Sequence, residues 1–165
     1  MSQEIERRFV LQTEPAAELL DAGTRLAQGY LCSGDGLSVR IRIVDTDAEL
    51  TVKGGGGLAR TEVNLPLGPD DAQALWPFTA DQRIDKVRYR VPLGPDGLVA
   101  EVDRYAGDLE GLLTAEVEFE DEQQAADFVP PAWFGLEVTG DRTWSNAALA
   151  RHGRPDRPDR PDRQA

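Results

Sequence analysis

The chain has 165 residues, of which 40% are hydrophobic, and its 30 acidic and 18 basic side chains give a formal net charge of −12. This length predicts a single domain, since most domains contain roughly 100–200 residues. The negative charge opposes general binding to nucleic acids, because a phosphate backbone would meet a field of like sign. A local basic site inside an acidic protein remains compatible with this charge.

The chain has one cysteine and one histidine. Cys32 is expected to be a small buried residue, and its isolation excludes an internal disulfide and a multi-cysteine zinc site, which fits a reducing compartment. His152 leaves no basis for a histidine triad, so catalysis must rest on carboxylates, cations, hydroxyls or a metal with oxygen ligands. The sequence has neither a signal peptide nor an apolar run of about 18 residues, so we expect a cytoplasmic protein without membrane contact.

Alternation of polar and apolar residues predicts most of the secondary structure. In chain order, the predicted strands are residues 4–9, 26–32, 38–43, 49–53, 60–65, 86–91, 99–104 and 114–120. The short connections between them, rich in glycine and aspartate, favour antiparallel neighbours. Helices are predicted at 69–76, 121–128 and 141–151, and a short extended piece is predicted after Pro130-Pro131. The Arg-Pro-Asp repeats near the C-terminus predict that residues 152–165 are a disordered tail and that 1–151 form the domain.

The polar faces of these strands are almost entirely charged and contain many arginines. For any one strand, an ordinary solvated face explains the pattern, and Arg7, on the other face of its strand, is expected to face solvent. All the strands together favour a different arrangement, in which the charged faces point at one another around a ligand. The predicted fold is therefore mostly β, an α+β protein with an eight-stranded antiparallel barrel, a charged lumen and helices packed outside.

The charges also segregate by sign among the strands. The cations are Arg40, Arg42, Lys53, Lys86 and Arg88, and the carboxylates are Glu4, Glu6, Glu101, Asp103, Glu116 and Glu118. Two like charges 4 Å apart repel by about 4 kcal/mol at an effective dielectric of 20, so each group needs a counter-charge. A triphosphate with Mg²⁺ or Mn²⁺ would meet both needs, since these metals prefer oxygen ligands and bind partly through substrate phosphates.

An ordered series of motifs resembles the CYTH superfamily, the triphosphate tunnel metalloenzymes. The series is Glu4-Ile5-Glu6-Arg7-Arg8-Phe9, Gln28-Gly29-Tyr30-Leu31, Val39-Arg40-Ile41-Arg42, Thr51-Val52-Lys53, Arg60-Thr61-Glu62, Lys86-Val87-Arg88-Tyr89, Glu101-Val102-Asp103, Glu116-Val117-Glu118-Phe119 and Trp144-Ser145-Asn146. It covers roughly residues 2–150. The resemblance implies an eight-stranded tunnel that binds a triphosphate with a divalent metal.

The resemblance also implies roles for individual residues. It implies metal binding by Glu4, Glu6, Asp103, Glu116 and Glu118, with Glu101 as a secondary choice, phosphate binding by Arg8, Arg40, Arg42, Lys53, Arg60, Lys86 and Arg88, and catalytic roles for Lys86 and Glu62. Two positions depart from the family pattern: Arg8 replaces the usual lysine, and Asn64 stands where some relatives carry a second acid. Tyr30 could point inward beside Gln28, but packing is the commoner role for an aromatic residue on a strand.

The closest functional match is the group of stand-alone inorganic triphosphatases. We therefore expect hydrolysis of tripolyphosphate to diphosphate and phosphate, with Mg²⁺ or Mn²⁺ as cofactor and a small-molecule triphosphate as substrate. The alternatives are a class IV adenylyl cyclase, a thiamine triphosphatase and a polyphosphate-binding module without turnover. The sequence leaves a homodimer open.

Overall fold

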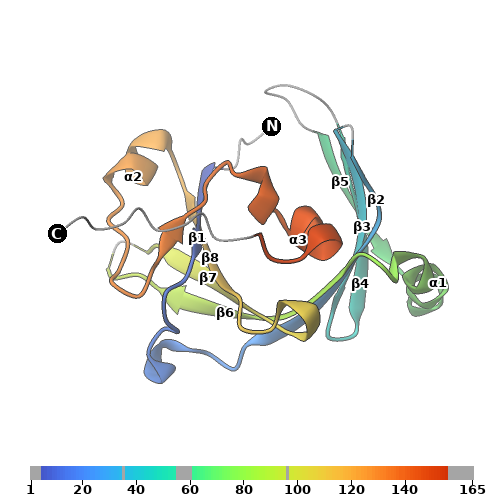
Figure 1. Ribbon diagram of the computed structural model, residues 1–165, viewed down its shortest axis with the longest axis horizontal. Helices are drawn as coiled ribbons and strands as arrows, with labels where there is room; N and C mark the ends of the chain where they lie inside the picture. Colours follow the sequence, from blue (N-terminus) through green and yellow to red (C-terminus); the bar gives the residue numbers. More distant parts are fainter. Residues whose placement is uncertain (1–4, 35, 55–60, 96, 156–165) are drawn as a thin grey trace.

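The computed structural model describes residues 5–34, 36–54, 61–95 and 97–155, which form one strongly curved antiparallel sheet with helices on both faces (Figure 1). The nine strands lie in the order β5-β4-β3-β2-β6-β7-β8-β1-β9. Their bounds are β1 Ile5–Val10, β2 Thr24–Gly34, β3 Leu37–Val44, β4 Asp47–Gly54, β5 Thr61–Leu67, β6 Arg83–Pro92, β7 Val99–Tyr105, β8 Leu113–Phe119 and β9 Leu136–Glu137. The helices are α1 Pro69–Leu75, α2 Glu122–Asp127 and α3 Asn146–His152, with 3-10 turns η1 Ala17–Leu19, η2 Trp76–Thr79, η3 Gly107–Leu109 and η4 Arg142–Trp144.

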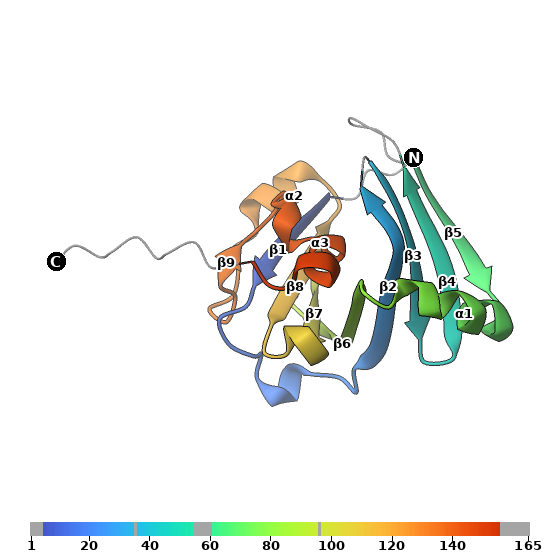
Figure 2. The same cartoon turned by 45° about the vertical axis from the view of Figure 1, so that its right-hand side comes forward.

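The mostly antiparallel β fold is confirmed, and the eight predicted strands correspond to β1–β8. Two details differ from the prediction. A ninth strand, β9, pairs with β1 through Phe9–Glu137 and Val10–Leu136, and in the part of the chain described here the sheet is open between β5 and β9 (Figure 2). The physical reason is that β9 and the backbone bond from Val138 N to Arg8 O occupy the free edge of β1, where a closing strand would pair.

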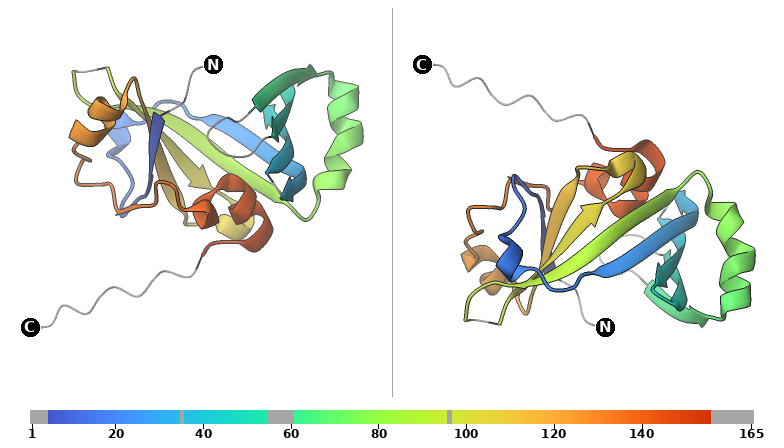
Figure 3. Two further views of the ribbon diagram at one scale, coloured as in Figure 1. Left: turned by 90° about the horizontal axis from the view of Figure 1, so that it is seen from above. Right: turned by 90° about the horizontal axis from the view of Figure 1, so that it is seen from below.

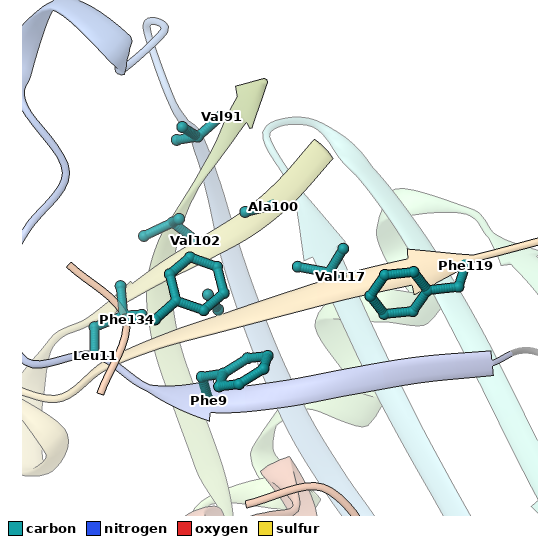
Figure 4. Packing of buried hydrophobic residues seen from close by; sticks show 9 residues of the cluster. Phe9, Leu11, Val91, Ala100, Val102, Val117, Phe119 and Phe134 are labelled. Carbon is teal, nitrogen blue, oxygen red and sulfur yellow. The ribbon is translucent and has the colours of Figure 1, made fainter. Parts of the chain in front are cut away.

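The outer, apolar face of the sheet carries one hydrophobic core. Phe9, Val102 and Val117 are almost fully buried there, and α2 and the segment after it cover them through Phe128 and Phe134 (Figure 4). The Phe9 and Phe134 rings lie 4.8 Å apart between centroids. Full burial of such a side chain contributes about 1.5–3 kcal/mol to stability. Burial of this cluster therefore fixes which face of β1, β7 and β8 is the outer one, and leaves the charged face on the concave side.

At the other end of the sheet, η2 and α1 pack on the outer face of β2 and β4 (Figure 3). Gly29 makes this close approach possible, because a Cβ at this position would lie 2.4 Å from the Thr79 hydroxyl oxygen. Gln28 and Tyr30, the neighbours of Gly29 on β2, therefore have their side chains on the concave face.

A β-bulge follows Tyr30 in the pairing of β2 with β3. Tyr30 pairs with Arg40, but the next matched pair is Cys32 with Val39. The extra residue turns Cys32 onto the face opposite Tyr30 and leaves it exposed, so the expectation that Cys32 is buried was wrong. Tyr30, in contrast, is buried on the same face as Arg40.

A second hydrophobic cluster lies on the concave face and corrects the expectation that every helix packs outside. Trp144 and Leu149 pack there against Val10, Ile84 and Tyr105. α3 thus sits within the curve of the sheet, where it contacts β2 and β6 (Figure 1). The Ser145 hydroxyl caps this helix by accepting from Ala148 N, which fixes where the chain enters the concavity.

Candidate active site

The concave face carries every predicted site residue that the structure describes. These are Glu6, Arg8, Arg40, Arg42, Lys53, Glu62, Lys86, Arg88, Asp103, Glu116 and Glu118, and the strand register puts all of them on one face. Glu4 and Arg60 lie outside the described residues. The predicted segregation by sign holds only in part. Arg40 and Arg42 lie on β3, and Glu116 and Glu118 lie on β8, but β1 carries both Glu6 and Arg8, and Glu49 on β4 lies opposite Arg42.

Arg40 and Arg42 supply positive charge that nearby carboxylates offset only in part, since Glu62 interacts with Arg40 and Glu49 with Arg42 without forming a salt bridge. Neither forms a salt bridge with a carboxylate of the described chain, and the Nε atom of each is buried without a hydrogen-bond partner there. Burial lowers the pKa of Arg42, and the neighbouring Arg40 and Arg88 lower it further. An arginine pair held this close needs an anion, and a guanidinium matches phosphate oxygens in two-pronged hydrogen bonds.

Lys53 and Glu62 form an ion pair across β4 and β5, with 2.6 Å between Nζ and Oε2. Burial alone would raise the pKa of Glu62, but Lys53, the Asn64 amide and the charge of Arg40 outweigh it and hold the pKa below its ordinary value. Asn64 Nδ2 donates to Glu62 Oε1 at 3.3 Å. Asn64 therefore supports Glu62 rather than adding a carboxylate, and a catalytic role for Glu62 stays a prediction.

Lys86, Arg88 and Asp103 form a buried ion network between β6 and β7. Asp103 accepts from Lys86 Nζ at 2.5 Å and from Arg88 through a two-pronged contact, with Nε and Nη2 each at 2.7 Å. The side chains of Lys86 and Asp103 are each only 1% exposed. Burial lowers the pKa of Lys86, whereas Asp103 is held below its ordinary pKa because Lys86 and Arg88 together outweigh its burial.

Arg8 extends this network to β1 and β8. It forms a salt bridge with Glu116 and lies 3.6 Å from Glu6, between Nη2 and Oε1. Glu116 also lies 3.5 Å from Arg88 Nη2, and Arg88 pairs with Glu101 as well. Although burial opposes it, the charges of Glu116 and Glu6 raise the pKa of Arg8. The carboxylates Glu6, Glu116 and Glu118, here called the carboxylate wall, are therefore partly neutralised by Arg8 and Arg88. Arg40 and Arg42 form no salt bridge with them.

A divalent metal would be expected at the carboxylate wall. Glu6 and Glu118 lie directly opposite each other on β1 and β8, and two like charges at such a position are destabilising without a cation between them. Glu116 is the next carboxylate on the same face of β8. These oxygen donors suit Mg²⁺ or Mn²⁺, whereas Asp103 is already enclosed by Lys86 and Arg88. Among the residues that the structure covers, no group of three or more carboxylates is drawn together as a ready-made metal site.

Three polar contacts on the concave face were not assigned from the sequence. Tyr105 Oη donates to Asn146 Oδ1 at 2.7 Å, which ties α3 to β7. Arg8 Nη1 donates to the Trp144 carbonyl oxygen at 3.2 Å, so the entry into α3 also holds a site cation. Gln28 Nε2 donates to Tyr30 Oη at 2.9 Å, which places both of these side chains inward.

Comparisons with known proteins identify the class of fold and then the family. No family model matches the chain. A solved structure of the inorganic triphosphatase NE1496 superposes with a TM-score of 0.74 and 39% identity, covering 92% of this chain and 96% of that one. A putative adenylyl cyclase from Hippeastrum, at 15% identity, a TM-score of 0.53 and coverage of 75% and 83%, shares the fold alone. The fold is thus that of the CYTH-type triphosphatases and cyclase-like proteins.

Two curated relatives carry the same name. The chain is 43% identical over 148 residues to an inorganic triphosphatase of Nitrosomonas europaea, covering 89% of this chain and 96% of the relative. It is 34% identical over 154 residues to an inorganic triphosphatase of Acetivibrio thermocellus, covering 92% and 96%. The chain therefore belongs to the inorganic triphosphatase family, a family of hydrolases. Within the described residues, no helix is long and apolar enough to cross a membrane.

Proposed function

We propose that this protein hydrolyses inorganic tripolyphosphate to diphosphate and phosphate on the concave face of the sheet. The observation that carries the proposal is the pair Arg40 and Arg42, whose buried Nε atoms lack partners among the described residues. The names of the two relatives, both inorganic triphosphatases, support the reaction. A ligand of high negative charge is the natural counter-charge for this pair.

The roles of the residues follow from their contacts. Arg40, Arg42 and Lys53 bind the phosphates along β3 and β4, and Arg8 and Arg88 approach them from the carboxylate side. Arg88 is already held in orientation by Asp103, so it binds phosphate with little further loss of side-chain freedom. Lys86, fixed by the same carboxylate, places a positive charge at the end of the phosphate chain where the bond breaks.

Glu6, Glu116 and Glu118 would hold Mg²⁺ or Mn²⁺. The metal would supply charge neutralisation on the transferring phosphoryl group. Arg8 and Arg88 both form ion pairs with Glu116 and so hold its side chain in place. Asp103 acts indirectly, because it holds the Lys86 and Arg88 side chains in position.

The experiment is an incubation of the protein with Mg²⁺ and, in separate reactions, tripolyphosphate, thiamine triphosphate or ATP. Phosphate, diphosphate and cyclic AMP are then quantified. We expect tripolyphosphate to be consumed with the highest kcat/KM. Cyclic AMP and diphosphate from ATP, with tripolyphosphate left intact, would instead identify a cyclase. Preference for thiamine triphosphate would identify a thiamine triphosphatase, and binding of tripolyphosphate without turnover would identify a binding module.

A further inference from the structure

Arg8 is a cation that lies among the carboxylates of the carboxylate wall. It is directly opposite Glu116 in the pairing of β1 with β8, and the two side chains form a salt bridge. Arg8 Nη2 also lies 3.6 Å from Glu6 Oε1. The side chains of Arg8 and Glu116 are only 19% and 14% exposed, so solvent screens this ion pair incompletely. Arg8 therefore contacts two of the three carboxylates that the proposed metal site requires.

The segment that leads into α3 holds the other end of the Arg8 guanidinium. Arg8 Nη1 donates to the Trp144 carbonyl oxygen at 3.2 Å. The Trp144 side chain is 3% exposed and packs in the same hydrophobic cluster as Val10, which belongs to β1 like Arg8. Because a buried segment fixes Nη1, Nη2 stays beside Glu116 without the help of a ligand.

A divalent cation and Arg8 compete for the same carboxylate oxygens. Mg²⁺ binds such oxygens directly, at about 2.1 Å, so Glu116 has to exchange its contact with Arg8 for a contact with the metal. Two positive charges this close also repel each other, and the repulsion is stronger where water is partly excluded. In the part of the chain that the structure covers, no three carboxylates are drawn together, which agrees with a wall that Arg8 already compensates.

We infer that Arg8 is a resident counter-cation of the metal site, which lowers its affinity for Mg²⁺ or Mn²⁺ while no triphosphate is bound. This inference rests on the metal site of the proposed function. Arg8 Nε is buried and has no hydrogen-bond partner among the described residues, so the guanidinium keeps a donor for a phosphate oxygen. A triphosphate that attracts Arg8 releases Glu116 to the metal. By linkage, the metal and the triphosphate then strengthen each other's binding.

The first measurement is a calorimetric titration of each full-length protein with Mn²⁺ in the absence of any phosphate compound. Arg8→Met removes the charge but keeps an unbranched side chain, and Arg8→Lys keeps the charge. We expect Arg8→Met to bind Mn²⁺ at least about 10-fold more tightly than the wild type, because Glu116 then keeps only the longer contact with Arg88, at 3.5 Å. Arg8→Lys should stay closer to the wild type than Arg8→Met does.

The second measurement is a titration of the same proteins with tripolyphosphate in excess chelator. Arg8→Met should bind tripolyphosphate about 10-fold more weakly than the wild type, because the phosphate loses a charged donor. Opposite effects on the metal and on the triphosphate distinguish this role from a structural one, since a damaged fold weakens both. Arg25→Met is the matched control, because Arg25 is exposed on the opposite face of β2, and it should match the wild type in both titrations.

Thermal unfolding covers the case of a variant that is less stable. Without Arg8 the carboxylates repel one another, so Arg8→Met should have a lower Tm than the wild type, and Mn²⁺ should raise its Tm by more. Unchanged or weaker Mn²⁺ binding in Arg8→Met, an equal gain in Arg8→Lys, or no Mn²⁺ binding by any of the proteins would overturn the inference. A wild type that shows the expected titrations but leaves tripolyphosphate intact with Mg²⁺ would overturn the proposed hydrolysis alone.

Discussion

Arg40 and Arg42 are the two side chains whose removal should affect triphosphate binding most directly. Each should contribute a charged hydrogen bond of about 1.5–3 kcal/mol, so Arg40→Ala or Arg42→Ala should raise KM for tripolyphosphate about 10-fold or more. Arg25→Ala is the matched control, since Arg25 is exposed on the opposite face of β2. Steady-state kinetics on the three variants would measure KM for tripolyphosphate and so check this prediction. An effect of Arg25 as large as that of Arg42 would mean that the wrong face of the sheet has been assigned to the substrate.

Asp103 should determine stability at acidic pH. Lys86 and Arg88 hold its pKa below the value of about 3.9 in an unfolded chain, so its contribution is present above that value and is lost as the pH falls through the folded-state pKa. Asp103→Asn leaves Lys86 buried without its carboxylate and should cost about 3–5 kcal/mol at pH 5–8.

Urea unfolding of wild type and Asp103→Asn across pH 3–8 would measure this difference. The gap between the two proteins should narrow below about pH 4, because there the Asp103 carboxylate of the unfolded wild type begins to take up a proton while the folded one stays ionised down to its lower pKa. Asp85→Asn, an exposed position on the outer face of β6, should match the wild type throughout. A gap that stays constant down to pH 3 would contradict the ionic role of Asp103.

At the scale of elements, Arg7 connects β1 to β9 and α2. The sequence predicted a solvent-facing side chain, but Arg7 forms a two-pronged contact with Glu137, at 2.9 and 2.7 Å, and donates to the carbonyl oxygens of Ala125 and Phe128. That prediction was wrong because residues 125–137 fold back onto β1. A contact between segments this far apart in the chain cannot be predicted from the alternation of residues within one strand.

Arg7→Ala should therefore reduce stability while leaving the active site intact. Loss of two carbonyl contacts and a partly exposed ion pair should lower the free energy of unfolding by about 1–3 kcal/mol. KM and kcat for tripolyphosphate should stay within about twofold of wild type. Chemical denaturation and kinetics on the same preparation would check both. A rise in KM comparable to that of Arg42→Ala would place Arg7 in the site.

Strict alternation explains which elements were predictable. In β3, Arg40 and Arg42 alternate with apolar residues, so both the strand and its charged face follow from the sequence. β9 has two residues, too few for any periodic signal. In β2, the residues around Gln28 mix small and apolar side chains, and the bulge changes the alternation after Tyr30. The burial of Gln28 therefore required the structure.

At the scale of the molecule, the sequence predicted the sign of each wall but not how the walls are neutralised. The ion pairs of Arg8 with Glu116 and of Arg88 with Asp103 join residues far apart in the chain, and only the strand register shows them. The face of the sheet that α3 covers was likewise not predictable from the sequence. Its apolar residues, such as Leu149, suit either face of a sheet, and the contact of Trp144 with the concave face is what decides.

The curved sheet thus carries Arg40 and Arg42, which form no salt bridge within the described residues, and the carboxylates Glu6, Glu116 and Glu118 on one concave face, and both groups should be needed for the same reaction. The most direct test follows tripolyphosphate by ³¹P NMR in the presence of the protein and Mg²⁺, with and without excess chelator. We predict that tripolyphosphate disappears with formation of diphosphate and phosphate in equal amounts, and that chelator stops the reaction. Persistence of tripolyphosphate with Mg²⁺, or hydrolysis that continues unchanged in chelator, would contradict a metal-dependent triphosphatase.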